Sequence, residues 1–90
     1  MPANPPIRVA ASSPDVAAAL RDLLDDYLAT SEPGEGESLV TVQPIEDERR
    51  GTCIYRIIQA SRTVAARYPA ASLFLITEDG SRWRLPPPAL

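Results

Sequence analysis

The chain has 90 residues, of which 44% are hydrophobic and 23% charged, and its formal net charge is −3. These values are typical of one small globular domain and argue against a wholly disordered chain. Histidine and lysine are absent, all nine basic residues are arginines, and the one cysteine is Cys53. This inventory excludes Ser-His and Cys-His nucleophile pairs, imidazole metal ligands, lysine Schiff bases and an internal disulfide. We therefore expect a protein that is not an enzyme and that uses neither a cofactor nor a metal.

Two further features concern location and charge. The longest apolar runs, such as LFLI at 73–76, are too short to span a bilayer, and MPANPPIR has no signal-peptide pattern, so we expect a cytoplasmic protein without a membrane partner. Arginine without lysine, beside abundant alanine and proline, is typical of GC-rich bacterial genomes. Residues 1–48 hold ten acids and two arginines, net −8, whereas 49–90 hold two acids and seven arginines, net +5. This asymmetry favours pairing within the fold, across a homodimer or with outside partners.

The first elements in the chain are an arm, a strand and a helix. Three prolines within residues 1–6 indicate a disordered N-terminal arm. Residues 7–11, IRVAA, alternate in polarity as a half-buried strand does. Ser13 as a cap, Pro14 at the first helical position and an amphipathic pattern then predict a helix over 14–29.

An acidic segment and a second strand follow. SEPGEGES at 31–38 combines glycine, proline and three glutamates with nothing apolar to bury, which predicts a flexible loop. LVTVQPI at 39–45 is β-branched and alternating, which predicts a strand that ends at Pro44.

The second helix has a clear end and an uncertain start. Apolar residues recur at helical spacing up to Tyr68, and Pro69 supplies the stop. The helix begins either at Cys53, with Thr52 as its cap, or near Glu46 and Asp47. We favour the later start, because arginines oppose the helix dipole at an N-terminus.

The C-terminal part predicts a β-hairpin. Within TEDGSRWR, the pair Asp79-Gly80 is typical of a two-residue type I′ turn between strands over 73–78 and 81–85. This turn pairs Ile76 with Trp83, which predicts two distinct faces. One is a core face with Phe74, Ile76, Trp83 and Leu85, and the other joins Leu73, Leu75 and Thr77 to Arg82 and Arg84. A proline-rich tail occupies residues 87–90.

Together the elements have the order βαβαββ. This order predicts a single small α/β domain over residues 7–86, bordering on α+β, with a mixed sheet of four strands and two helices. If the strands lie in sequential order, both helices cover one face. If the third strand lies across the first from the second, the helices cover opposite faces. A ferredoxin-like variant is one alternative fold.

The second half of the chain resembles thioredoxin-like proteins. VQPIEDE is similar to a strand that ends in an acidic turn, and RYPAASLFLITEDGSRW is similar to the Tyr-Pro, apolar strand and glycine turn before that fold's last hairpin. The Cys-x-x-Cys motif is absent and no helix follows the hairpin. The resemblance therefore implies an alternative fold that has lost its redox chemistry.

Two groups of residues could form chemical sites, but each also has a simpler interpretation. Cys53 near Arg49, Arg50 and Arg56 is a candidate thiolate, which would make a thiol-dependent redox protein, but free cysteines more often pack as small hydrophobes. Asp22, Asp25 and Asp26 share part of a helix surface, yet no second acidic motif completes a metal site, so a solvated face is the preferred interpretation.

The remaining candidates are protein-binding surfaces. An acidic chain with one aromatic among its arginines does not favour nucleic acid. The leading hypothesis is a non-enzymatic protein–protein interaction module that docks a partner, or a second copy in a homodimer, through a charged helix edge and the C-terminal hairpin. An alternative is an acidic inhibitor or immunity-type protein whose aspartates bind a basic target. The predicted contact residues are Arg56 and Arg67 opposite Asp15, Asp22 and Asp26, and Leu73, Leu75, Arg82 and Arg84 on the hairpin.

Overall fold

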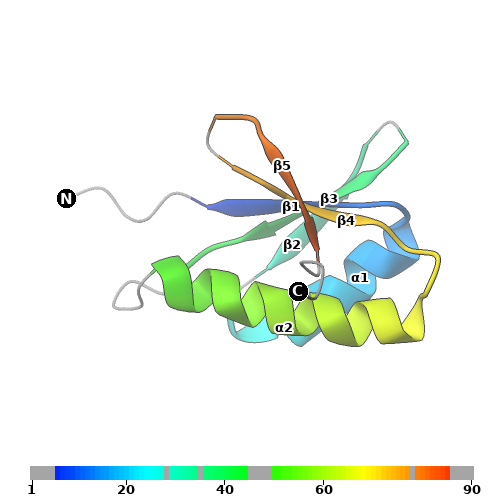
Figure 1. The fold of residues 1–90 in the computed structure, drawn as a ribbon, viewed down its shortest axis with the longest axis horizontal. Helices are drawn as coiled ribbons and strands as arrows, with labels where there is room; N and C mark the ends of the chain where they lie inside the picture. The colour runs from blue at the N-terminus through cyan, green and yellow to red at the C-terminus, as the bar shows by residue number, and fades with distance from the viewer. Residues whose placement is uncertain (1–5, 28, 35, 45–49, 78, 86–90) are drawn as a thin grey trace.

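The computed structural model, shown in Figure 1, describes residues 6–27, 29–34, 36–44, 50–77 and 79–85. In chain order its elements are β1 (Ile7–Ala11), α1 (Pro14–Leu23), a short 3₁₀ helix η1 (Asp25–Tyr27), β2 (Thr30–Pro33), β3 (Ser38–Val42), α2 (Arg50–Arg67), β4 (Leu73–Ile76) and β5 (Arg82–Leu85). The strands form one sheet in the order β2-β3-β1-β4-β5, in which every neighbouring pair is antiparallel. Of the predicted arm at 1–6 and tail at 87–90, only Pro6 lies within the described residues.

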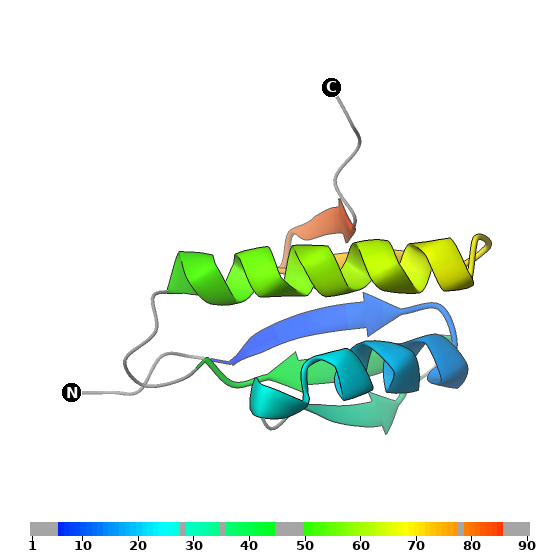
Figure 2. The ribbon, with the colours of Figure 1, turned by 90° about the horizontal axis from the view of Figure 1, so that it is seen from below.

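The strand order β2-β3-β1-β4 is that of the split β-α-β, or ferredoxin-like, motif, and β5 extends it. α1 links β1 to β2 and α2 links β3 to β4, so each helix connects two strands that run the same way on either side of a third. Figures 1 and 2 show both helices on one face of the sheet. The prediction of one small domain with two helices, α/β bordering on α+β, is confirmed, and the antiparallel sheet makes the domain α+β. It has five antiparallel strands where the sequence predicts a mixed sheet of four.

The additional strand lies in the acidic segment. Thr30–Pro33 forms β2, which pairs with β3 through Glu32 opposite Leu39, so the prediction of a loop over 31–38 is wrong at 31–33 and at Ser38, where β3 begins. Gly34, Gly36 and Glu37 lie outside the strands, as predicted. The N–H of Gly34 donates to the carbonyl of Glu37 at 2.7 Å and closes the hairpin. Because β2 reverses the chain before β3, β3 runs antiparallel to β1, and both helical connections return to the same face. Neither of the two helix arrangements predicted from the sequence includes this reversal of the chain.

Both helices differ from prediction at one end. The hydroxyl of Ser13 accepts a hydrogen bond from the Val16 N–H at 3.3 Å, so the predicted cap of α1 is confirmed, but α1 ends at Leu23 instead of 29. The 3₁₀ turn that follows brings Tyr27 into the core. α2 begins at Arg50, earlier than the favoured start at Cys53, and it ends before Pro69 as predicted. Glu46 and Asp47, at the other possible start, lie outside the described residues.

The core lies between the helices and the sheet face that they cover. Cys53 is packed there with 0% exposure, and the Ser61 hydroxyl, also buried, donates to the Ile58 carbonyl at 2.6 Å. The largest fully buried aliphatic side chains are Ile7, Val9, Leu20, Leu24, Val40, Val42, Ile57, Val64 and Leu73.

Within the part of the chain that the structure describes, neither helix is long and apolar enough to cross a bilayer.

The β4–β5 hairpin exists, but its register differs from the prediction by one residue. Leu75 pairs with Trp83, and Ile76 with Arg82. The Thr77 N–H donates to the Ser81 carbonyl at 2.9 Å, which leaves three residues in the loop instead of two. Gly80 takes a φ of 88°, as expected where a type I turn is followed by a left-handed residue.

Because of this one-residue shift, the side chains of β4 share a face with different side chains of β5 from those predicted. Leu73 and Leu75 point to the helices with Trp83 and Leu85, whereas Phe74 and Ile76 lie on the helix-free face with Arg82 and Arg84. The predicted grouping of Leu73 and Leu75 with the two arginines is therefore wrong, as is a core position for Phe74 and Ile76. The predicted core position of Trp83 is also wrong, because its side chain lies on the helix-covered side but is 62% exposed.

Candidate functional site

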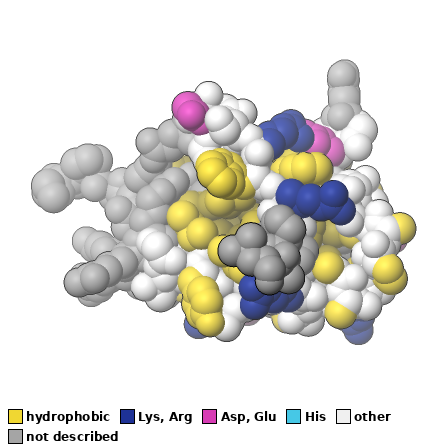
Figure 3. All heavy atoms as spheres, viewed as in Figure 1, with side chains coloured by type: hydrophobic (Ala, Val, Ile, Leu, Met, Phe, Trp, Pro, Cys, Tyr) yellow, Lys and Arg dark blue, Asp and Glu magenta, His cyan; other side chains and the backbone are white. Residues whose placement is uncertain are grey.

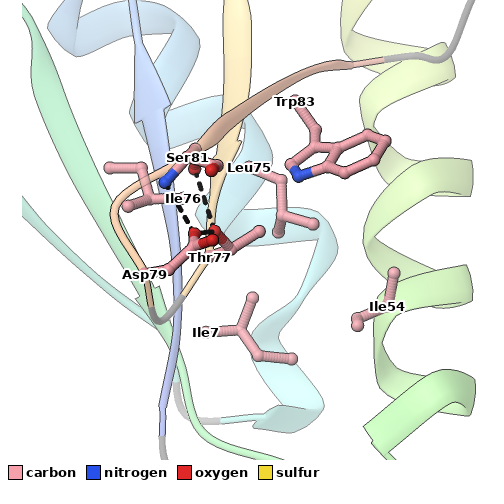
Figure 4. Close-up of a pocket in the computed structure, with 8 residues that line it drawn as sticks. All are labelled: Ile7, Ile54, Leu75, Ile76, Thr77, Asp79, Ser81 and Trp83. Carbon is pink, nitrogen blue, oxygen red and sulfur yellow. Dashed lines mark hydrogen bonds between the residues drawn. The ribbon is translucent and has the colours of Figure 1, made fainter.

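A groove of about 420 Å³ lies between the β4–β5 hairpin and the N-terminal half of α2, as Figure 4 shows. We call it the Trp83 groove. Trp83 and Leu75 project from the hairpin, and Ile54 of α2 faces them across the groove. Hydrophobic side chains gather on this side of the molecule in Figure 3. The lining is completed by Ile7, Ile76, Thr77, Asp79 and Ser81.

The exposure of Trp83 follows from its position in the sheet. β5 is the edge strand, so Trp83 has a strand neighbour, β4, on one side alone among the described strands. Its indole N–H has no hydrogen-bond partner within the described residues. A large aromatic ring, whose donor is unpaired among the described residues, therefore lies at the rim of an apolar groove.

The hairpin loop gives the groove one polar end. Asp79 accepts hydrogen bonds from the Thr77 hydroxyl and, at 2.9 Å, from the Ser81 N–H. These hydrogen bonds, the one from Thr77 first, lower the pKa of Asp79 from 3.8 to about 2. Asp79 is thus a carboxylate at neutral pH, and it places a negative charge beside the apolar walls.

The predicted charged helix edge is partly paired inside the domain. Arg56 of α2 contacts Asp26 at 3.1 Å, and its guanidinium lies 5.7 Å from the centre of the Tyr27 ring. Asp22 contacts Arg21 of its own helix at 3.5 Å. Both pairs are exposed, so each adds little stability. The structure thus brings Arg56 to the aspartate stripe of α1 and η1.

Other predicted residues are not brought together. Asp15 in the first turn of α1 and Arg67 in the last turn of α2 are exposed and form no ion pair with the described residues. Leu73 is 1% exposed, so its side chain does not reach the surface. Cys53 is buried in the core, where a thiol lacks the access that reactivity requires. Across the described ranges, no group of three or more potential metal-ligating side chains occurs.

Sequence reasoning missed the helix-free face of the sheet. We define this open face by the outward positions of the five strands. Ala10 on it is 1% exposed and Leu39 is half-buried, while its arginines are exposed. To predict this face from the sequence, one would need the correct register of β4 against β5 and the knowledge that β2 is a strand. The open face consists of Arg8, Ala10, Thr30, Glu32, Leu39, Thr41, Phe74, Ile76, Arg82 and Arg84.

A bidentate ion pair crosses the open face. Arg82 donates to the two carboxylate oxygens of Glu37 at 3.0 and 2.8 Å. Glu37 immediately precedes β3 and Arg82 lies in β5, so the pair bridges β1 and β4. Figure 1 shows that the β2–β3 and β4–β5 hairpins both bend away from the helices, which brings these side chains within reach. The hydrogen bond from Arg82 lowers the pKa of Glu37 and raises that of Arg82 itself.

Comparison with known proteins assigns no family. No protein-family model, no curated protein and no solved structure matches the chain. A functional proposal therefore has to rest on the chemistry of the Trp83 groove, the charged helix edge and the open face.

Proposed function

We propose that this protein is a non-enzymatic protein–protein interaction module that binds a segment of a partner protein in the Trp83 groove. One observation carries the proposal: Trp83 is 62% exposed beside an apolar groove that the described residues leave unfilled. Tryptophan is among the residues most enriched at binding hot spots. Its ring supplies a large contact area, and few side-chain torsions need to be fixed on binding.

The lining of the groove indicates the chemistry of the partner. Ile54, Leu75 and the Trp83 ring form apolar walls that suit an aliphatic or aromatic side chain. Asp79 at the hairpin end is ionised, which favours a cation beside that side chain and disfavours phosphate groups. The preferred ligand is therefore a short segment with an apolar residue next to arginine or lysine, and neither nucleic acid nor a membrane surface.

The two alternative functions have less support. An acidic inhibitor would present Asp15, Asp22 and Asp26 to a basic target, but Asp22 and Asp26 already contact arginines of the same domain. A thiol-dependent redox protein would need access to Cys53, which is buried. The buried thiol and the internally paired aspartates both favour binding at the groove.

Peptide binding tests the proposal directly, because Trp83 is the one tryptophan of the chain and reports on the groove by fluorescence. Three sets of short synthetic peptides are titrated: leucine or phenylalanine beside arginine, the same apolar residues beside glutamate, and serine beside arginine. We expect the first set alone to shift the Trp83 emission to shorter wavelength in a saturable way. Equal responses to all three sets, or no response to any, would overturn the proposal.

Two adjacent residues of α2 supply a matched pair of variants. Ile54 lines the groove, whereas Tyr55 is 57% exposed outside it. Ile54→Ser removes apolar contact and should weaken peptide binding about tenfold or more, while Tyr55→Ser should change it less than about twofold. Circular dichroism checks that both variants remain folded. Equal losses would place the binding site elsewhere.

A further inference from the structure

We infer that the open face of the sheet binds the open face of a second copy, forming a symmetric dimer. That both described helices lie on the other face is not a sufficient reason, because one face of an antiparallel sheet is often solvated. The reason is the distribution of charged and apolar side chains across the strands. The inference does not depend on the Trp83 groove, whose apolar walls Ile54, Leu75 and Trp83 belong to the helix-covered side, although Ile76 borders both surfaces.

One row of side chains runs across all five strands. The strand register places Glu32 beside Leu39, Leu39 beside Ala10, Ala10 beside Phe74 and Phe74 beside Arg84. The row therefore begins with a carboxylate at the β2 edge and ends with a guanidinium at the β5 edge. Between the charges lie three apolar residues.

A two-fold axis parallel to the strands makes this row complementary to itself. Such an axis, placed between two facing sheets, reverses the strand order of the second copy and keeps the central strand β1 opposite β1. Glu32 of each copy then faces Arg84 of the other. Leu39 faces Phe74, whereas Ala10 near the axis is 1% exposed within its own copy and adds almost no contact area. An axis perpendicular to the strands would set β2 against β2 and lose these matches.

The ion pair on the open face is compatible with the same symmetry. Arg82 and Glu37 form a charge pair that crosses the β1–β4 region near the axis. The two-fold axis sets Arg82 of each copy opposite Thr30 of the other, so the pair stays within its own copy and places no like charge against Arg82. One contact is unfavourable, because Arg8 on the central strand faces Arg8 of the second copy.

The size of the open face indicates a weak dimer. Five strands spaced by about 4.8 Å, with about 3.3 Å per residue along each, present a face of roughly 24 by 15 Å. This is smaller than the patch of about 800 Å² per partner in a standard interface. We expect a monomer–dimer equilibrium that depends on protein concentration and weakens with salt, with two Trp83 grooves on the outer sides of the dimer.

Charge exchange between Glu32 and Arg84 tests the arrangement by sedimentation equilibrium. Glu32→Arg and Arg84→Glu each set like charges opposite one another, so each single variant should raise the dimer dissociation constant at least about tenfold. The double variant and an equimolar mixture of the two single variants should both recover dimer, since opposite charges face again. Recovery in the mixture also shows that the single variants are folded.

Helix-side variants provide the control. Asp15→Arg and Arg67→Glu change charge equally but lie on the helix-covered side, and they should leave dimerisation within about twofold of the wild type. Arg8→Ser removes the like-charge contact and should strengthen the dimer. A wild-type chain that stays monomeric at every concentration would overturn the inference. So would a dimer that Glu32→Arg leaves unchanged, or a mixture that fails to recover.

Discussion

The two hairpins at opposite ends of the sheet are stabilised in different ways. In the β4–β5 hairpin, Leu73 and Leu85 are buried against the helices, and the loop is held by the Asp79 side chain. In the β2–β3 hairpin, β2 reads TSEP and contributes no large apolar side chain, so it is held by backbone pairing with β3 and by a hydrogen bond of 3.1 Å from Arg21 of α1 to the Ser31 hydroxyl. The comparison shows that a strand can form without a hydrophobic face when its neighbour supplies the burial.

The largest difference in stability between the hairpins is expected when one leucine in each is shortened to alanine. Leu73→Ala leaves a cavity at a fully buried site of β4 and should lower the free energy of unfolding by about 2–5 kcal/mol. Leu39→Ala removes the same atoms from a half-buried site of β3 and should lower it by about 1 kcal/mol. Urea denaturation of dilute protein measures both. Equal losses would contradict a difference in burial between the two hairpins.

The next largest losses of stability are expected at the two turns, because each hairpin has a glycine at positive φ. Gly80 has a φ of 88° and Gly36 one of 73°, and a Cβ at either would meet no atom within 4 Å. Gly80→Ala and Gly36→Ala should each lower the free energy of unfolding by about 1–2 kcal/mol through backbone strain alone. The loss is measured by chemical denaturation.

Gly51 of α2 is the matched control for these turns. Its Cβ position is equally open, but it lies in a helix and no positive φ is present there. Gly51→Ala should therefore raise stability by about 0.5–1 kcal/mol. A gain from alanine at Gly80 or Gly36 would show that the left-handed conformation is not required at that turn.

The same contrast explains which parts of the fold the sequence predicts. The strand at Leu73 and the helix after Ser13 are recognised because burial and capping leave local patterns in the residues. β2 is not recognised, because its stabilisation comes from pairing with residues that follow it in the chain. Once β2 is missed, the direction of β3 and the placement of both helices cannot be derived.

At the candidate site, the prediction from the sequence is wrong by one residue in the register of the β4–β5 hairpin, again because the deciding contact is not a local pattern. Asp79-Gly80 correctly indicates a hairpin, but a two-residue and a three-residue loop share this pair and differ in one hydrogen bond, from the Thr77 N–H to the Ser81 carbonyl. The resulting shift of one residue exchanges Leu75 and Ile76 between the faces. Pairing of Arg82 with Glu37 depends on sheet curvature, for which a local pattern carries no signal.

The smallest predicted effects concern two carboxylates, one from each hairpin. Asp79 has a pKa lowered to about 2, first by the Thr77 hydroxyl, and Glu37 has a pKa lowered by hydrogen bonds from Arg82. Because both folded-state values lie below the unfolded ones, each group stabilises the fold above its ordinary pKa of 3.8 or 4.5. That stability is lost as the pH falls through the lowered value. Asp79→Asn and Glu37→Gln should thus differ from the wild type at pH 7 and approach it under acid conditions.

Salt separates the two carboxylates further, because their partners differ in charge. Glu37 is held by a guanidinium, so the wild-type advantage over Glu37→Gln should shrink as salt screens the exposed pair. Asp79 accepts from a neutral hydroxyl and a neutral N–H, so its advantage over Asp79→Asn should change less. Denaturation midpoints at low and high salt, at pH 7 and at pH near 2, measure both. If the Glu37 contribution proved as salt-independent as that of Asp79, the ion pair would not be what joins the two hairpins in solution.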